Sequence, residues 1–452
     1  MKSFTISESV CSYLSQPFRA VFAIILFGIV AGQPLSSALA TVVYPTGSYP
    51  LDVQNVRTAV SGGGPVLLKA VNTTGQPTAF NFGPAIRNGD GVNLTVDVRI
   101  IGEQTGQHRT TIQGGFIPIL CQSPIHLSIK SINFDGPCGA AIIILASSGA
   151  EIVGNHISNV VPDPLPVGFT ETDGIDLLGG DLDPTQSSIT GRAVVSGNVI
   201  ENLSGQFANG VQFDNVAAFS TITGNTVRIP QPAGTVQSIG LLAFRLHNVC
   251  AIFGNSVTIG PSASNVYPSG IFVGGGTDGR YLITGNNIMS KNANADGIDV
   301  VGFNSSGPTN NAWVAANRVA IHSQIETSGG VVFYGAINNS VMLANRISGT
   351  SGNAIQILGQ DDSLVADSNR VINNDISHMS SSVADIFFGP FSTNNQFVGH
   401  CASFIDQGIN NHVSCGPMVD LGSGGTRSSL VKVSNSSLRL AVFDGLRERL
   451  GR

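Results

Sequence analysis

The stretch Ile252-Phe-Gly-Asn255-Ser-Val257 decides the fold, because close variants of it recur along the chain. Each copy has an Asn at its centre, with an apolar residue three positions before it and another two positions after it. The central residues are Asn155, Asn198, Asn225, Asn255, Asn286, Asn317, Asn345 and Asn369. Successive copies are about 24 to 43 residues apart, a period typical of solenoids and propellers. We therefore expect one small structural unit stacked many times.

A second motif precedes most copies: a turn-forming residue and Gly, followed by alternating apolar positions. Examples are Asp173-Gly-Ile-Asp-Leu177, Ser269-Gly-Ile-Phe-Val273 and Asp296-Gly-Ile-Asp-Val300. Strands this short, without amphipathic stretches of about 10 to 15 residues between them, exclude a doubly wound α/β sheet. A propeller blade needs about 40 or more residues per repeat, and a membrane barrel needs strands of about ten residues with aromatic girdles. The pattern predicts an all-β parallel solenoid.

The repeated Asn has a structural explanation. Asn tolerates the left-handed backbone region that tight corners require. Its side-chain amide can also bond to the Asn of the next coil, which would give an internal ladder. We assign this column no catalytic role.

These repeats resemble the right-handed parallel β-helix proteins, the superfamily of pectate lyases and polygalacturonases. The segment from Leu51 to Lys69 is similar to the family's first coil, in which a short amphipathic helix caps the solenoid and a Gly-Gly turn leads into a strand. Segments 97–103, 111–115 and 127–136 resemble early coils, so the likeness covers roughly residues 50 to 415. The resemblance implies a right-handed parallel β-helix with a short N-terminal capping helix.

Composition agrees with a stacked apolar interior. Charged residues make up 11% of the chain, against about 25% in ordinary globular domains, and the chain contains 55 glycines. The net charge of -6 and the lack of a basic domain argue against nucleic acid as a partner.

The N-terminal region, residues 1–40, is predicted to be a signal peptide. Lys2 and Arg19 precede an apolar run from Ala20 to Ala31, and Ala38-Leu-Ala40 supplies small residues where a signal peptidase cuts. An apolar run of about 12 residues is short for a membrane span. We therefore expect cleavage after Ala40, an exported protein, and contact with the membrane only through this leader.

The remaining chain divides into a β-helix domain, residues 41–415, and a tail, residues 416–452. The tail begins Gly/Ser-rich and then continues with a stretch, 436–450, in which every fourth residue is apolar. The apolar stripe consists of Leu438, Val442, Leu446 and Leu450. It predicts a C-terminal helix that covers the apolar end of the solenoid, with a partner-binding helix as the alternative.

Cysteine spacing fits an oxidising compartment. Cys121 and Cys138 are about one coil apart, and Cys401 and Cys415 are similarly close, so two local disulfides are predicted. Cys250 is left over and is expected to be a small buried hydrophobe. No Cys/His spacing resembles a zinc site.

The outward positions of the Gly-containing strands form two columns. The first contains Asp176, Gln212, Leu242, Phe272, Asp299, Val332 and Gln356, and the second contains Leu178, Asp214, Phe244, Gly274, Val301, Tyr334 and Leu358. Sugar rings could stack on Phe244, Phe272 and Tyr334, with Asp299 as a further substrate contact. Alternatively, the chain's own loops or another subunit cover this half-apolar face.

The acidic end of these columns is the candidate for catalysis. Asp173 and Asp176 lie on one coil, Asp214 on the next, and Arg245 with His247 on the one after. Strands are about 4.8 Å apart, so these groups fall within the separations used by paired carboxylates in glycoside hydrolysis.

Three interpretations of these residues stay open. Two carboxylates could act as general acid and base on a glycosidic bond. Calcium bound by the carboxylates could instead assist Arg245 in removing the proton next to a uronate carboxylate. In the third, Asp173 and Asp296 merely form turns before Gly and the other acids are solvated.

The motifs of the resembled enzymes are only partly present. Thr172-Asp173-Gly-Ile-Asp176 is similar to the first acidic motif of polygalacturonases, with Glu171 where that family has Asn. The later Gly-His-Gly and Arg-Ile-Lys motifs, and the Arg/Lys signature of the lyases, are absent from the sequence. The resemblance therefore implies a fold and no named activity.

Three arginines, Arg318, Arg346 and Arg370, follow the corner Asn in what we expect to be successive coils. Stacked like charges repel, so they require acidic neighbours such as Asp367 and Asp375, or a bound acidic polysaccharide. The sequence thus predicts an exported protein that binds or processes a polysaccharide, as a lyase or a hydrolase if it is an enzyme. The alternative is a non-catalytic surface protein that binds partners, or a second copy of itself, through its apolar face.

Overall fold

The structure is a computed structural model. It describes residues 39–415, except 85–90, 163–170, 181–186, 231–234, 236, 262–267, 276–278, 292–293, 304–306 and 324. The predicted signal peptide up to residue 38 and the predicted C-terminal helix lie outside the described residues.

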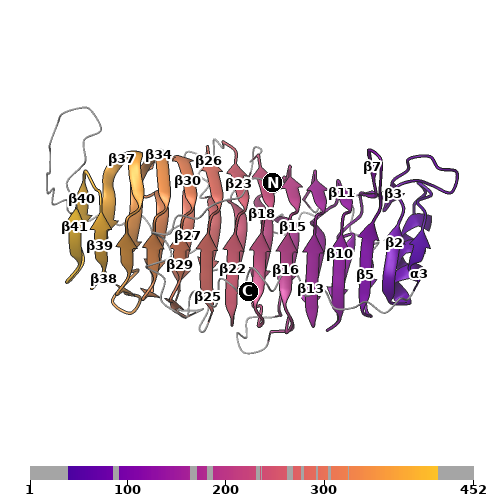
Figure 1. The fold of residues 1–452 in the computed structure, drawn as a ribbon, viewed down its shortest axis with the longest axis horizontal. Helices are drawn as coiled ribbons and strands as arrows, with labels where there is room; N and C mark the ends of the chain where they lie inside the picture. Colours follow the sequence, from indigo (N-terminus) through magenta and orange to yellow (C-terminus); the bar gives the residue numbers. More distant parts are fainter. Residues whose placement is uncertain are drawn as a thin grey trace, which may run out of the picture. The chain divides into compact units, whose positions relative to one another are not determined.

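The described residues form a right-handed parallel β-helix, as predicted. Its strands stack in register along one axis (Figure 1), in a 14-stranded sheet, a 21-stranded sheet and a small 4-stranded sheet. Apart from one antiparallel hairpin, β6 (Gln104–Thr105) with β7 (His108–Arg109), the paired strands within these described ranges are parallel.

The 14-stranded sheet forms one side of every coil. Its strands, in stacking order, are β1 (Thr41–Val43), β2 (Gly64–Leu68), β5 (Val98–Gly102), β10 (His126–Lys130), β13 (Gly149–Val153), β16 (Ala193–Ser196), β19 (Ser220–Thr223), β22 (Val249–Phe253), β25 (Arg280–Thr284), β29 (Trp313–Ala315), β33 (Val341–Leu343), β36 (Arg370–Ile372), β39 (Gln396–Gly399) and β41 (His412–Cys415).

The 21-stranded sheet contains two rows of strands. The first row is β3 (Phe80–Asn81), β8 (Thr111–Gln113), β11 (Asn133–Asp135), β14 (His156–Ser158), β17 (Val199–Glu201), β20 (Thr226–Ile229), β23 (Ser256–Ile259), β26 (Asn287–Ser290) and β30 (Arg318–His322). The second row is β4 (Val92–Leu94), β9 (Ile119–Gln122), β12 (Ala140–Ala146), β15 (Glu171–Leu178), β18 (Phe207–Asp214), β21 (Gln237–Phe244), β24 (Ser269–Gly274), β27 (Asp296–Gly302), β31 (Gly329–Gly335) and β40 (Phe404–Asp406). The long strands β34 (Arg346–Leu358) and β37 (Asp375–Phe388) run through both rows and join them.

The small sheet closes the later coils. It consists of β28 (Thr309–Asn310), β32 (Ile337–Asn338), β35 (Ala366–Asp367) and β38 (Ser392–Thr393).

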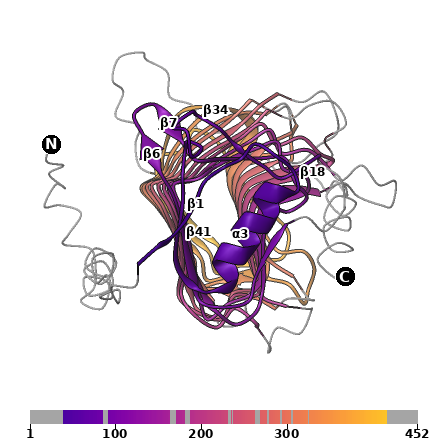
Figure 2. The same ribbon diagram turned by 90° about the vertical axis from the view of Figure 1, so that its right-hand side faces the viewer.

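Helix α3 (Leu51–Ser61) caps the first coil, as predicted. Figure 2 shows it lying across the open end of the β-helix. It buries Val53, Val56 and Val60 against the first strands. Its buried Asp52 carboxylate accepts hydrogen bonds from the backbone N–H groups of Thr46 (2.7 Å) and Asn81 (2.8 Å), which tie the helix to the chain before it and to β3.

The interior is one continuous apolar core, the inner core. The residue three positions before each corner Asn stacks in register on its counterpart, as in Ile222, Ile252 and Ile283 of the 14-stranded sheet. The residue two positions after it does the same in the first row. These side chains are fully buried, which confirms the predicted inward pattern.

The predicted Asn ladder exists, but its last member was wrongly assigned. Side-chain amides bond from coil to coil at 2.8–3.1 Å, through Asn155, Asn198, Asn225, Asn255, Asn286, Asn317, Asn345 and Asn374. Asn369 instead belongs to a second ladder with Asn395 and Asn411, at the corner before β36. Two Asn-x-apolar patterns five residues apart fit the motif equally well, and Val371 in fact stacks on Met342 inside β36.

The predicted stripe of three arginines is wrong for the same reason. Arg318 and Arg346 do pair in neighbouring strands, but Arg370 lies in the 14-stranded sheet. The residue beside Arg346 in the next strand is Asp375, whose carboxylate is 3.6 Å from the guanidinium. A hydrogen bond from Ser377 and, to a smaller extent, the charge of Arg346 lower the pKa of Asp375.

The Gly of the second motif is required by close packing and not by a turn. Strand β15 continues through Gly174 without interruption, so the interpretation of Asp173 as a turn former is wrong. A Cβ at the equivalent Gly240 would lie 2.3 Å from Val257 Cγ1 and 2.5 Å from the carbonyl oxygen of Gly270. Any larger residue would force the two rows of the sheet apart.

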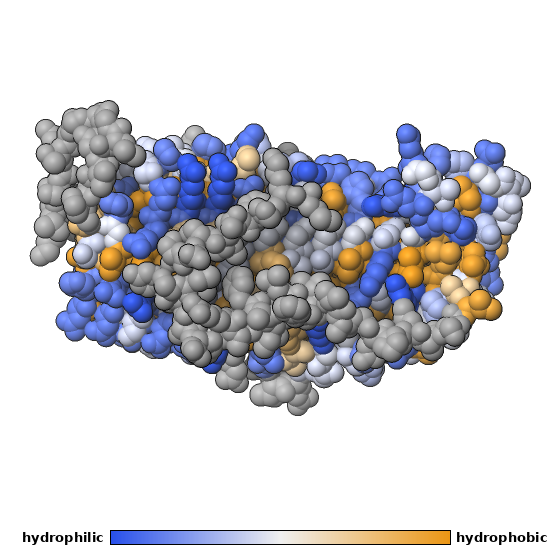
Figure 3. Space-filling view, in the orientation of Figure 1, coloured by the Kyte–Doolittle hydropathy of each residue, from blue (hydrophilic) through white to orange (hydrophobic). Residues whose placement is uncertain are grey.

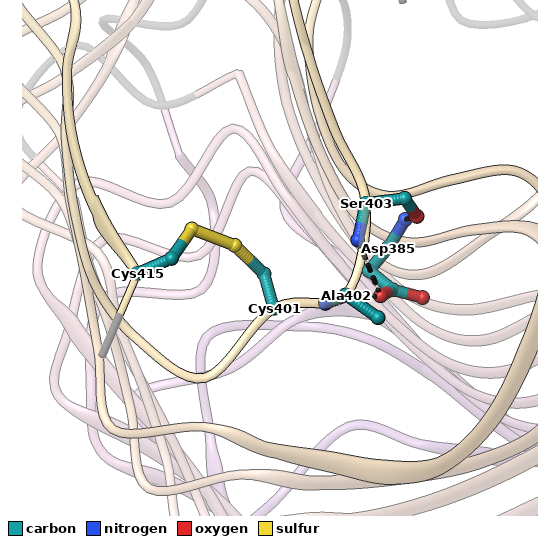
Figure 4. Close-up of a disulfide and its surroundings, with 5 residues drawn as sticks. All are labelled: Asp385, Cys401, Ala402, Ser403 and Cys415. Carbon is teal, nitrogen blue, oxygen red and sulfur yellow. Dashed lines mark hydrogen bonds between the residues drawn. A yellow bond between two sulfur atoms is a disulfide. The ribbon is translucent and has the colours of Figure 1, made fainter. Parts of the chain in front are cut away.

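One of the two predicted disulfides is present. Cys401 and Cys415 are bonded, with their Cα atoms 5.7 Å apart (Figure 4). Beside the bridge, the Asp385 carboxylate accepts hydrogen bonds from the backbone N–H groups of Ala402 (2.9 Å) and Ser403 (3.0 Å). The bond thus links the loop before β40 to the last strand.

The predicted bond between Cys121 and Cys138 is wrong, because both side chains are buried and neither sulfur belongs to a disulfide. The two residues lie on adjacent coils, but Cys138 aligns with Phe116, five residues before Cys121 along the same path. At about 3.3 Å per residue this separation exceeds what a disulfide can bridge. Cys250 is buried, as predicted, and burial raises the pKa of its thiol.

Candidate functional site

The two predicted outward columns lie in register on the second row. Asp176 is beside Gln212, Gln212 beside Leu242 and Leu242 beside Phe272, and the second column follows in the same way from Leu178 to Leu358. We call the outward side of β15, β18, β21, β24, β27, β31 and the end of β34 the outer face.

Most of the outer face is buried within the chain. Nine apolar side chains form a cluster separate from the inner core, which we call the apolar patch: Ile239, Leu242, Phe244, Phe272, Val301, Phe303, Val332, Tyr334 and Leu358. Each is at most 7% exposed. Four rings follow one another in the order Phe272, Phe244, Phe303 and Tyr334, with neighbouring centroids 6.2–6.4 Å apart. Of the two alternatives left open by the sequence, the described residues show a covered face and not an open groove.

Polar side chains gather at one end of the outer face. Asn209 donates through its side-chain nitrogen to Asp173 Oδ1 (2.8 Å), Gln212 Oε1 (2.9 Å) and Glu171 Oε1 (3.2 Å). Asp176 follows Asp173 on the same strand, and these five residues are the acid cluster. Asp173 and Asp176 are each 4% exposed, whereas Glu171 and Gln212 are half-buried. The cluster therefore reaches the surface on the side of Glu171 and Gln212.

The electrostatics of the acid cluster favour a bound proton. Burial raises the pKa of Asp173 well above its usual value of 3.8, and the neighbouring charges of Asp176 and Glu171 raise it further. A hydrogen bond with Asp176 acts in the same direction, while the bond from Asn209 opposes it. Two carboxyl groups this close in a buried site share a proton instead of both ionising.

The other predicted catalytic residues form a separate group. Arg245 Nε donates to Asp214 Oδ1 at 2.8 Å and its Nη2 donates to the second carboxylate oxygen, a bidentate pair. The guanidinium also lies 5.9 Å from the centre of the Phe244 ring. His247 Nε2 contacts Asn215 Oδ1 at 2.7 Å. These contacts hold Arg245 as the ion-pair partner of Asp214, which lies on β18 two residues after Gln212 and beside Leu178 of β15. The grouping of all five predicted catalytic residues stays a prediction.

Asp299, a predicted substrate contact, has its carboxylate bound by a residue of the neighbouring strand. The hydroxyl of Ser269 donates to its carboxylate, and both residues are buried. Gln356, in the same column, donates through Nε2 to the carbonyl oxygen of Ser328 at 2.9 Å. This part of the outer face is thus held by internal hydrogen bonds.

Sequence reasoning did not single out Asn209 and Gln212 as site residues. The signal was available, because Asn209-Gly-Val-Gln212 has the same spacing as Asp173-Gly-Ile-Asp176 and stacks on it in register. Asn209 and Gln212 stand on the next coil at the positions that Asp173 and Asp176 hold on theirs. Amide side chains beside carboxyl groups indicate hydrogen bonds in which the amides donate to the carboxyl oxygens.

Other surfaces are less suited to chemistry. A groove of about 700 Å³ lies beside β1 and α3, and Tyr44 is its sole ionisable lining residue. Figure 3 shows apolar side chains on the surface toward the α3 end. In the first strands of the 14-stranded sheet, Val42 of β1 is beside Leu67 of β2, and Leu67 is beside Ile101 of β5. Neither surface combines acid, base and polar donors.

Among the described residues there is no grouping of three or more His, Cys, Asp or Glu side chains that could hold a metal ion. Within the same ranges, no helix has the length and apolar character needed to cross a membrane.

Comparisons with known proteins give similar structures only. No family model matches the chain, and no curated protein matches its sequence significantly. The A-module of the mannuronan C-5 epimerase AlgE6 from Azotobacter vinelandii has a TM-score of 0.41 and 14% identity over 84% of this chain and 98% of its own. The DFA-IIIase of Arthrobacter chlorophenolicus A6, without its lid and in complex with GF2, has a TM-score of 0.41 and 12% identity. The match covers 86% of this chain and 98% of that chain. A PL6 alginate lyase in complex with a trisaccharide has a TM-score of 0.34 and 12% identity, and the match covers 81% of this chain and 87% of that chain. At these TM-scores and identities, the likeness does not indicate which activity this chain has.

Proposed function

We propose that this protein acts on a glycan at the acid cluster, as a glycoside hydrolase or a polysaccharide lyase. The observation that carries the proposal is the buried pair Asp173 and Asp176, in which burial and the neighbouring carboxylates raise the pKa of Asp173. Burying two carboxyl groups side by side destabilises a fold, and strongly shifted carboxyl groups on an outer face are a mark of functional sites.

The arrangement supplies both halves of proton transfer. The protonated member of the pair can donate to the oxygen of a leaving sugar, and the ionised member, or Glu171, can receive a proton from water or from a ring carbon. Asn209 holds Asp173, Glu171 and Gln212 together. A glycan would reach the pair past the half-buried Glu171 and Gln212.

The remaining predicted contacts have supporting roles in this proposal. Phe244, Phe272 and Tyr334 are buried in the apolar patch, so we assign them to the packing of the outer face beside the acid cluster and not to sugar stacking. Arg318 and Arg346, both exposed on the first row, bind carboxylate groups if the glycan is acidic. Calcium is not needed for these steps.

We also propose that the protein is exported and that its leader is removed after Ala40. Two observations support this. Strand β1 begins at Thr41, so the cut would leave the first strand intact. The bond between Cys401 and Cys415 suits an oxidising compartment.

The test is to incubate the chain that begins at Thr41 with a panel of neutral and uronate-containing polysaccharides. New reducing ends report hydrolysis, and ultraviolet absorbance of unsaturated products reports lyase action. Asp173→Asn and Asp176→Asn should each lower the rate at least about 100-fold. The control is Asp361→Asn, since Asp361 makes only local turn contacts and is remote in sequence from the cluster.

The alternative is a non-catalytic protein that binds glycans or partners through the outer face. The observation that favours it is that Arg245 and Asp214 bind each other in a bidentate ion pair, which occupies both groups. No product from any polymer, together with retained glycan binding, would establish this alternative and exclude the enzyme.

A further inference from the structure

The 14-stranded sheet has an outward side that the proposed function does not use. In the end view of Figure 2, its first and last strands, β1 and β41, lie one behind the other, whereas β18 of the outer face lies on the other side of the coil. The sheet is therefore nearly flat along the stack. Its outward side is also separate from the acid cluster, which lies on β15 and β18.

Six successive strands of this sheet, β16, β19, β22, β25, β29 and β33, present two outward columns without a charged side chain. We call these two columns the uncharged face. Its small members are Ser, Thr and Ala, and its larger members are apolar and half-buried: Val194, Phe253, Leu282, Trp313, Val341 and Leu343. The exposed Arg280, at the start of β25, lies outside both columns. Depletion of charge around aromatic residues is the composition found at the core of protein interfaces.

The first row of the same coils has a different surface. Its outward positions include His156, Glu201 and Arg228, and the Glu201 carboxylate lies 2.9 Å from His156 and 3.0 Å from Arg228. Arg346 and Asp375 form a further ion pair on this row. Because both surfaces belong to the same coils, stacking does not explain why the uncharged face lacks charge.

Two opposite charges border the uncharged face. Glu151 of β13 precedes it and Arg370 of β36 follows it in the same outward column, seven strand steps or roughly 34 Å apart. Both residues are exposed, and Glu151 accepts a hydrogen bond from Lys130 at 2.6 Å. The two charges are equally far from the middle of the face, which lies between β22 and β25.

We propose that two copies of this chain pack together through the uncharged face. They are related by a twofold axis that runs parallel to the strands and passes between β22 and β25. This axis reverses the stacking order of the second copy, so Glu151 of each copy lies opposite Arg370 of the other. The inference goes beyond the proposed function and does not depend on it.

The same axis places larger side chains opposite smaller ones. In the column of Glu151 and Arg370, Leu282 lies opposite Ala251 of the second copy and Trp313 lies opposite Thr221. In the other column, Phe253 lies opposite Thr284 and Leu343 opposite Ser196. Alternation of large and small residues lets two flat layers interdigitate.

The contact is large enough for a specific dimer. From β10 to β39, ten strands of each copy overlap. At about 4.8 Å per strand and about 13 Å of strand length, they cover roughly 600 Å² per copy as a flat projection. The total of roughly 1,200 Å² reaches the lower limit of specific interfaces. Beyond these strands Arg99 would lie opposite His412, so we expect the contact to end there.

Other occupants explain less of this surface. A polysaccharide or an unrelated protein does not require opposite charges at equal distances from one centre. It also does not require that larger and smaller residues exchange places about that centre. The dimer leaves both acid clusters on the outside, because the outer face lies on the other side of each coil.

The decisive experiment exchanges the two charges in the full chain and measures association by sedimentation velocity. The wild type is expected to be a dimer at micromolar concentration. Glu151→Arg brings two arginines together and Arg370→Glu brings two carboxylates together, so each should weaken dimerisation at least about tenfold. The double variant restores both pairs and should dimerise within about threefold of the wild-type affinity.

The matched control is Arg228→Glu, at an exposed position of the first row, which should leave the dimer unchanged. A protein that stays monomeric up to about 100 µM would overturn the proposal. A dimer that responds to neither exchange, or a double variant as weak as the single ones, would place the association elsewhere and overturn it too. Association through the predicted leader belongs to that outcome.

A second measurement uses Trp313, the single tryptophan of the chain. In the dimer its indole lies in the contact, so dissociation on dilution should shift its fluorescence emission to longer wavelengths, with the midpoint found by sedimentation. Emission that stays constant while the dimer dissociates would contradict the proposed face. Emission that responds to added polysaccharide in a monomeric protein would assign the face to a glycan and overturn the proposal.

Discussion

The two faces of the same strands differ in how regular they are. On the inner face, each side chain meets the same kind of residue in the coils above and below, and the Asn ladder and the Ile/Val columns repeat with little change. On the outer face, the column that begins with Asp176 changes to Gln212, then to Leu242 and Phe272. Repetition marks what every coil needs in order to stack. A change from coil to coil marks positions that are free to serve a local purpose.

The largest expected effect of a single substitution is on the inner face, in the ladder. Asn255→Ala would leave the backbone and side-chain N–H groups of Asn225 and the Ile222 carbonyl without this partner. The Asn286 oxygen would lose one of its two donors and keep the backbone N–H of residue 255. Several unsatisfied buried groups at about 1–3 kcal/mol each predict a loss of roughly 4–6 kcal/mol in the free energy of unfolding. Urea denaturation followed by circular dichroism measures it.

The matched control is Asn287→Ala, at the exposed position directly after the ladder residue Asn286 in the next coil. It should change stability by less than about 0.5 kcal/mol. Equal losses in the two variants would show that the ladder is not what distinguishes the inner face.

A pair of phenylalanines compares the two faces directly. Phe213 points into the inner core and Phe272 belongs to the apolar patch, and both are at most 2% exposed. Phe213→Ala should cost about 3–5 kcal/mol, because the cavity cannot collapse between stacked strands. Phe272→Ala should lower the free energy of unfolding by less. Its effect cannot exceed the free energy with which the covering residues pack on the apolar patch. Equal costs by urea denaturation would mean that the patch is a second permanent core.

The inner face was largely predictable from sequence because its spacing repeats. The same reasoning failed where two alignments fit equally well, as at Asn369, where the true ladder residue is Asn374. It also failed for Cys121 and Cys138, because sequence spacing gives the coil but not the position along the strand. The partner Asn209 of Asp173 was missed because the reasoning followed acidic residues from coil to coil, although the amide of Asn209 stands in register with Asp173 on the next strand.

Two glycines show whether close packing or backbone conformation explains the recurring Gly positions of the coils. Gly240→Ala should destabilise the protein by about 3 kcal/mol, because its Cβ would collide with Val257 and with backbone of the next strand. Gly197→Ala, at a corner with φ of +63° and open space around it, should cost only about 1–2 kcal/mol from backbone strain. Thermal unfolding of both variants gives the comparison, and a larger cost at Gly197 would contradict the close-packing explanation.

The smallest effect is the pH dependence of stability caused by the acid cluster. Because the folded-state pKa of Asp173 is raised above its usual 3.8, the folded protein binds a proton more tightly than the unfolded chain. Stability from this group is fully present below pH 3.8 and is lost as the pH rises through the folded-state pKa. Asp173→Asn should abolish this part of the decline and leave the variant more stable than the wild type at neutral pH, even though the proposed catalysis is lost. Urea midpoints measured from pH 3 to pH 8 compare the two proteins, with Asp361→Asn as the control. A variant that is less stable than the wild type at neutral pH would show that Asp173 stabilises the packing of the strands. The acid cluster would then have a structural role, like the inner face, in spite of its different composition.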